Sequence, residues 1–152
     1  MTANQQPEQD TYDELVQRLG VALLDLVPEG GWARIDLVSA MTVPVQDLGL
    51  TVIMEDGSTP EITPPDELNV ILAKLRMLLY EEGRGTWFSA RVSVNPPGRI
   101  FCNFNMDYEP VLTAPMEAEH YVEDLRMFPR DREHMPDWLT AKIAAGGSEE
   151  RD

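Results

Sequence analysis

Residues 87–106 constrain the fold most strongly, because they have the pattern of two strands joined by a short turn. Apolar residues alternate with other residues over 87–94 and again over 99–106, and the turn residues Pro-Pro-Gly lie between the two segments at 96–98. A period of two places one side of each strand against a core, and such a turn favours a hairpin. We therefore expect an antiparallel hairpin, and on its first strand the residues of one side are Phe88, Ala90, Val92 and Val94.

Two amphipathic helices are predicted, and each precedes a pair of strands. The first begins at Thr11, because Thr11 and Glu14 have the spacing of a capping box. Apolar residues then recur every three or four positions as far as residue 26. Pro28, Gly30 and Gly31 follow and end the helix.

The second helix has the clearest sequence signals. Thr63 is a suitable N-cap, Pro64 suits the first helical position, and Gly83 and Gly85 end the segment. The apolar residues between them share helical spacing: Leu68, Ile71, Leu72, Leu75, Leu78 and Leu79. This spacing puts them on one face, which we expect to be buried.

The remaining segments complete a repeating order of elements. Strands are expected over 32–41 and 48–54, separated by a turn or bulge at 42–47 that contains Pro44. Helices are expected over 115–127 and from Pro136 onward. The order helix, hairpin, helix, hairpin, helix predicts the α+β class, with an antiparallel sheet of two hairpins and helices packed mainly on one face. We expect one domain over 10–144, between disordered tails at 1–9 and 145–152.

The charge of the chain narrows the range of partners. Twelve Lys and Arg residues stand against 27 Asp and Glu residues, which gives a net charge of -15. Such a field repels nucleic acids and anionic membranes and attracts a basic protein, although an acidic surface also serves solubility alone. The single cysteine, Cys102, allows no intrachain disulfide, and the polar first ten residues lack the pattern of a signal peptide. We expect a cytoplasmic protein that does not enter the membrane.

The sequence offers few candidates for catalysis. It has two histidines, no Gly-x-Ser-x-Gly segment and no phosphate-binding loop. Glu117, His120 and Asp124 have a spacing that presents all three on one helix face, where a metal ion could bind. No second Glu-x-x-His segment accompanies them, so a solvated helix face is the preferred interpretation. We predict no catalytic residue, no cofactor and no metal.

Residues 107–125, which we call the acidic block, contain six acidic residues and no Lys or Arg. Such a block can steer a basic partner, and an aromatic residue within it is typical of an interface anchor. The predicted partner-binding residues are Asp107, Tyr108, Glu109, Glu119 and Glu123. The alternative is that the block is ordinary solvated surface and that the interface lies on the open face of the sheet or on the loop at 55–60.

Short segments of the chain resemble a known family. The run Val-Pro-Glu-Gly-Gly-Trp at 27–32 resembles the Ile-Pro-Glu-Gly-Trp segment of YezG-like immunity proteins, with one additional glycine. Trp87-Phe88, followed by the hairpin and by residues 104–109, is similar to that family's Trp and Phe-x-Tyr-Asp-Tyr-Glu segments. Met106 stands where the family has an aromatic residue. The order of helices and hairpins also agrees over about residues 11–138.

This resemblance implies a bacterial immunity protein, or antitoxin. Such proteins bind a cognate secreted toxin inside the producing cell and block its active site. Toxins of this kind are often nucleases with basic grooves, in which an acidic inhibitor imitates the phosphate backbone. The alternative function is a non-catalytic acidic adaptor or secretion chaperone that holds a basic protein without inhibiting it.

Overall fold

The computed structural model describes residues 10–111 and 116–150, so the tail expected at residues 1–9 lies outside the described residues. The elements are α1 (Tyr12–Leu24), β1 (Trp32–Thr42), β2 (Val45–Met54), α2 (Asp66–Leu78), β3 (Ser89–Asn95), β4 (Arg99–Asn105), α3 (Ala118–Met127), the 3₁₀ helix η2 (Arg132–His134) and α4 (Asp137–Glu150). The four strands form one sheet in the order β2-β1-β3-β4, and all neighbours are antiparallel. The predicted α+β class and antiparallel sheet are confirmed.

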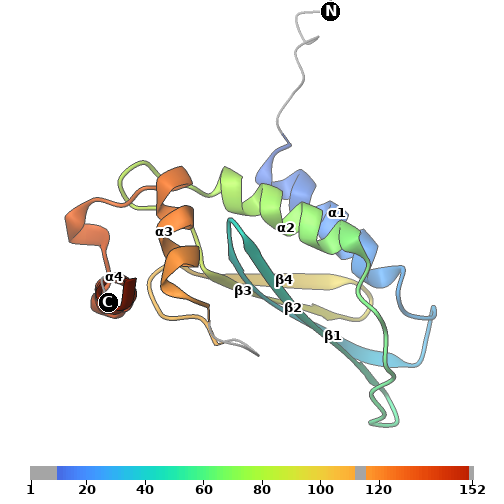
Figure 1. The fold of residues 1–152 in the computed structure, drawn as a ribbon. Helices are drawn as coiled ribbons and strands as arrows, with labels where there is room; N and C mark the ends of the chain where they lie inside the picture. Colours follow the sequence, from blue (N-terminus) through green and yellow to red (C-terminus); the bar gives the residue numbers. More distant parts are fainter. Residues whose placement is uncertain (1–9, 112–115, 151–152) are drawn as a thin grey trace, which may run out of the picture.

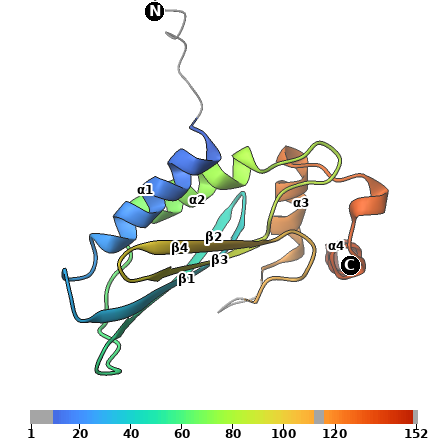
Figure 2. The ribbon, with the colours of Figure 1, turned by 180° about the vertical axis from the view of Figure 1, so that it is seen from behind.

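The main core lies between the sheet and the helices α1 and α2, which cover one of its faces (Figures 1 and 2). From α2, Leu68, Ile71, Leu72 and Leu75 are fully buried, which confirms the predicted apolar face. Alternate residues of all four strands complete this core. Among the described residues, no helix combines the length and the apolar character needed to cross a membrane.

The two predicted helix starts have different outcomes. The capping box of α1 is confirmed, because the Thr11 hydroxyl accepts from the Glu14 amide at 3.1 Å and the Glu14 carboxylate accepts from the Thr11 amide at 2.8 Å. The predicted start of α2 is wrong, since its N-cap is Pro65 and not Thr63. A residue that precedes proline is disfavoured in the helical conformation. Pro64 and Pro65 therefore hold the chain extended for two more residues.

The first hairpin is longer than its sequence pattern predicts. Strand pairing continues to Thr42 and Val45, so the turn consists of Val43 and Pro44 alone. The predicted wider turn or bulge at 42–47 is wrong. Proline has no amide hydrogen to contribute to a ladder, and in the turn none is needed. The tip of this hairpin reaches α3, where the Val43 amide donates to the Asp124 carboxylate at 2.7 Å.

A second, smaller core lies at one end of the sheet, where α3 and α4 pack (Figure 1). Its buried members are Ala40, Phe88, Met116, Tyr121 and Leu139. Successive residues of a strand point to opposite faces of the sheet. Ala40 directly precedes Met41, which belongs to the main core, so the second core lies on the opposite face. The prediction that Phe88 lies on the same side as Ala90 and Val92 is wrong. Phe88 belongs to the second core, and β3 begins only at Ser89.

The last helix also differs from its predicted end. The sequence pattern begins a disordered tail at residue 145, whereas α4 continues to Glu150. Gly146 lies so close to Ala118 of α3 that a β-carbon at Gly146 would overlap the Ala118 side chain. This glycine therefore allows two helices to approach each other, and it does not end the helix.

Candidate functional site

The loop that follows β4 presents the most exposed aromatic residue of the described chain. We call residues 107–111 the Tyr108 loop. The Asn105 side chain donates to the Tyr108 carbonyl at 2.8 Å and accepts from the Tyr108 amide at 2.9 Å, and Trp138 donates its indole hydrogen to the Asp107 carbonyl at 2.7 Å. The Tyr108 and Val111 residues are nevertheless 78% and 90% exposed. The backbone at Asp107 and Tyr108 is thus held in place while the Tyr108 ring faces solvent.

Arg130 joins the residue before this loop, and Asp107 at its start, to the rest of the molecule. Its guanidinium group donates to the Met106 carbonyl, to the Thr86 carbonyl at 3.1 Å and to the His134 carbonyl at 3.0 Å. It also lies 4.7 Å from the Phe88 ring centroid. Burial lowers the pKa of Arg130 from its ordinary value, and the Asp107 carboxylate, at 3.5 Å, opposes this shift. Arginine keeps its charge under such conditions, so Arg130 holds the strand end and the loop together.

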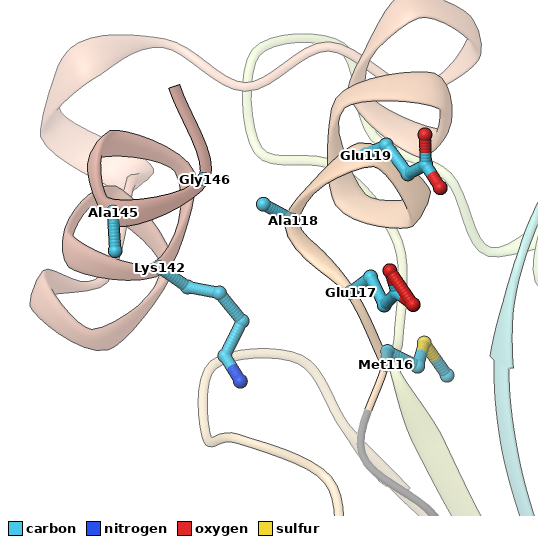
Figure 3. A pocket seen from close by; sticks show the side chains of 7 residues that line it. All are labelled: Met116, Glu117, Ala118, Glu119, Lys142, Ala145 and Gly146. Carbon is cyan, nitrogen blue, oxygen red and sulfur yellow. The ribbon is translucent and has the colours of Figure 1, made fainter. Parts of the chain in front are cut away.

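A second contact joins the Tyr108 loop to α4. The Lys142 ammonium group lies 3.0 Å from the Glu109 carboxylate and 6.0 Å from the Tyr121 ring centroid. Figure 3 shows Lys142 extending from α4, while the carboxylates of Glu117 and Glu119 point away from it. Burial raises the pKa of Tyr121 to about 12, with smaller contributions from Glu109 and Asp124. Tyr121 therefore remains an uncharged core residue at neutral pH.

Asp124 belongs to the interior and not to the acidic surface. Its carboxylate accepts from both terminal nitrogens of Arg76, at 2.5 and 2.7 Å, and both side chains are 3% exposed. The Arg76 Nε donates to the Trp87 carbonyl at 2.6 Å. The candidate metal ligands Glu117, His120 and Asp124 are therefore not assembled into a site. His120 instead uses its Nδ1 to accept from the Glu117 amide at 3.0 Å.

The structure brings three of the five predicted partner-binding residues together. Asp107, Tyr108 and Glu109 share one loop, whereas Glu119 and Glu123 lie one turn apart on the exposed side of α3. Several acidic residues of the block have basic partners from outside 107–125: Arg130 for Asp107, Lys142 for Glu109, Arg76 for Asp124 and Arg126 for Glu123. The surface of the acidic block is therefore less negative than its sequence indicates.

Three residues that build this site were not among the predicted partner-binding residues: Asn105, Arg130 and Trp138. Asn105 carries a local signal, because an asparagine often bonds the backbone a few residues further along a turn. Arg130 and Trp138 approach the loop from 23 and 31 residues away. No spacing pattern within the sequence indicates contacts of that range.

The geometry of the site is suited to binding a surface. A large amphipathic ring stands on a fixed backbone, next to half-exposed carboxylates that already have partners. No protein-family model matches this chain, and no curated protein matches it.

Proposed function

We propose that this protein acts by binding another protein through the Tyr108 loop and that it has no catalytic activity of its own. The observation that carries the proposal is the exposed Tyr108 ring on a backbone held by Asn105 and Trp138. A backbone held in this way loses little conformational freedom on binding, and tyrosine is enriched among residues that dominate interface energies. Val111 of the same loop is also exposed.

The partner that we propose is a cognate toxin with a basic surface, which the protein neutralises in the cytoplasm by blocking its active site. The net charge of -15 supports a basic partner. The resemblance to YezG-like immunity proteins supports the inhibitory role, and the resembling segment at 104–109 includes Tyr108 and Glu109. An adaptor or secretion chaperone would use the same loop but would leave the partner active.

Co-expression tests this proposal. Where a neighbouring gene encodes a toxin domain, that domain is expressed in a sensitive bacterial host, with and without this protein, and growth is measured. Restored growth, with loss of rescue in Tyr108→Ala at equal protein abundance, is the expected result. Binding of the toxin domain without restored growth supports the adaptor function instead. If the purified chain neither binds nor inhibits this toxin domain, the immunity function is wrong.

A further inference from the structure

Strand β2 forms one edge of the sheet, and among the described residues no strand pairs with its outer side. It is ten residues long, Val45–Met54, contains no proline, lysine or arginine, and has one charged residue, Asp47. Proteins usually protect such an edge with charges, proline, a bulge or a covering segment, because its free backbone groups accept another strand. The register of β1 and β2 shifts only between Trp32 and Arg34, opposite the last residues of β2. The rest of β2 therefore has no bulge that would protect its edge.

The hairpin register identifies which backbone groups of β2 point outward. Thr42 and Val45 flank a two-residue turn and pair directly, and hydrogen-bonded pairs alternate along an antiparallel ladder. The amides of Gln46, Leu48, Leu50 and Val52 therefore point away from β1. Met54 follows the same alternation, and its amide donates to the Ser58 carbonyl at 2.8 Å. The loop after β2 thus closes the edge at Met54, and among the residues that the structure describes no backbone group bonds to the outward amides of Gln46, Leu48, Leu50 and Val52.

The side chains along this edge are incompletely covered on the helix side of the sheet. Leu48 and Leu50 pack against the main core but remain partly exposed, whereas Val52 is buried. An additional strand with apolar side chains on this face would cover Leu48 and Leu50. Opposite residues of an antiparallel pair point to the same face of the sheet. The residues of the added strand whose backbone groups hydrogen-bond to β2 would therefore be the apolar ones.

The charge around the edge determines what the other side chains of such a strand would be. Residues 35–73, which include β2 and the loop after it, contain no Lys, Arg or His. Asp36 of β1 is already paired with Arg34 at 2.8 Å. The acidic residues that we count near the edge are therefore Glu55, Asp56 and Glu61 of the loop after β2 and Asp66 and Glu67 at the start of α2. The opposite edge of the sheet, β4, begins with Arg99, and Arg91 lies on the neighbouring strand. The two edges therefore differ in charge, and only β2 favours a basic partner.

We infer that β2 binds an extended segment of a partner protein, with alternating apolar and basic side chains, as a fifth strand of the sheet. The backbone ladder supplies affinity, and the apolar and basic side chains supply specificity. The inference does not depend on the Tyr108 loop, so the two proposals succeed or fail separately. A second copy of this chain is the weaker occupant, because both copies carry a charge of -15.

The test uses the full chain, labelled with ¹⁵N, and a blocked nine-residue peptide that alternates valine and lysine. We expect the peptide to slow amide hydrogen exchange at least tenfold at Gln46, Leu48, Leu50 and Val52 and to leave β4 unchanged. N-methylation of the valine nitrogens removes the expected ladder and should abolish binding. N-methylation of the lysine nitrogens, which would point away from β2, should leave binding intact.

A matched pair of variants tests the position of the peptide. Thr51 is exposed on the open face of β2 and its amide points toward β1, so Thr51→Lys should weaken peptide binding about tenfold by repulsion. Thr51→Val should bind as the unsubstituted chain does. Equal binding of both N-methylated peptides, protection of β4 amides, or no peptide binding at all would overturn the inference. A dimer that forms without peptide and is disrupted by Thr51→Lys would overturn it as well, since a second copy would then occupy the edge.

Discussion

Arg76 and Asp124 form a fully buried ion pair that joins three parts of the chain. Arg76 belongs to α2, Asp124 to α3, and the Asp124 carboxylate also accepts from Val43 at the tip of the first hairpin. The Arg76 guanidinium group further lies 5.1 Å from the Phe128 ring centroid. Removing one member of such a pair leaves an uncompensated charge in the interior. The pair therefore connects the main core to the α3 and α4 region.

Asp124→Asn tests this connection, because the substitution preserves shape and removes the charge. We expect the free energy of unfolding to fall by about 3 kcal/mol, measured by urea denaturation at pH 7. Glu123→Gln is the matched control, since the neighbouring Glu123–Arg126 pair is exposed; its effect should stay below about 0.5 kcal/mol. Equal urea midpoints for the two variants would show that the buried pair contributes nothing to stability.

Gly85 is a second residue whose substitution should lower stability, because an added β-carbon has no room there. Its φ is +89°, and a β-carbon there would lie 2.5 Å from the Arg130 Nε and 2.8 Å from the Arg130 Cγ. Gly57 has a similar φ of +87° and no atom within 4 Å of the same position. We expect Gly57→Ala to cost about 1 kcal/mol from backbone strain alone, and Gly85→Ala about 3 kcal/mol. If thermal denaturation showed the same loss for both, Arg130 would not be fixed where the structure places it.

Among the secondary-structure elements, α2 is held in place by its buried apolar face. Leu72→Asp places an unpaired charge among fully buried residues, so we expect a loss of more than 4 kcal/mol and an unfolded chain by circular dichroism. Val70→Asp is the control on the same helix, because Val70 is 51% exposed. It should change the free energy of unfolding by less than about 0.5 kcal/mol. A folded Leu72→Asp variant would mean that the opposite face of α2 is the buried one.

The elements themselves could be predicted because their signals are local. The helical spacing of Leu68, Ile71 and Leu72, the capping box at Thr11 and the alternation in 99–106 each lie within a few turns or residue pairs. The errors arose where two local signals competed, as with Thr63 against Pro65 at the start of α2. The α+β class follows from the order of elements, whereas the second core formed around Phe88 depends on long-range packing.

For the molecule as a whole, the sequence gives the net charge, but it does not show which acidic residues are exposed and which are paired with basic ones. In the sequence, the acidic block is negative along its whole length. In the structure, Arg76 pairs with Asp124, Arg130 with Asp107 and Lys142 with Glu109. Pairing across such distances depends on tertiary structure, which a one-dimensional charge pattern does not contain. The exposed aromatic character of Tyr108 was predictable, because it falls outside any helical or strand stripe.

Association with a partner should separate the roles of Tyr108 and of the overall charge. Tyr108→Ala should mainly raise the dissociation rate, since packing contacts are lost after the complex has formed. Phe101→Ala is the matched control, because Phe101 is also exposed, at 54%, but lies on the open face of the sheet. Surface plasmon resonance with the partner toxin domain measures both variants after circular dichroism has shown that they are folded.

Salt gives the complementary measurement, since long-range attraction to a charge of -15 is screened over about 8 Å at physiological ionic strength. The association rate of every variant should therefore fall as salt rises from low to physiological levels, while the Tyr108→Ala effect on dissociation persists. Glu119→Lys with Glu123→Lys should slow association further, because these side chains are exposed on α3. If Phe101→Ala accelerated dissociation and Tyr108→Ala did not, the interface would lie on the open face of the sheet, and the Tyr108 loop would be ordinary surface.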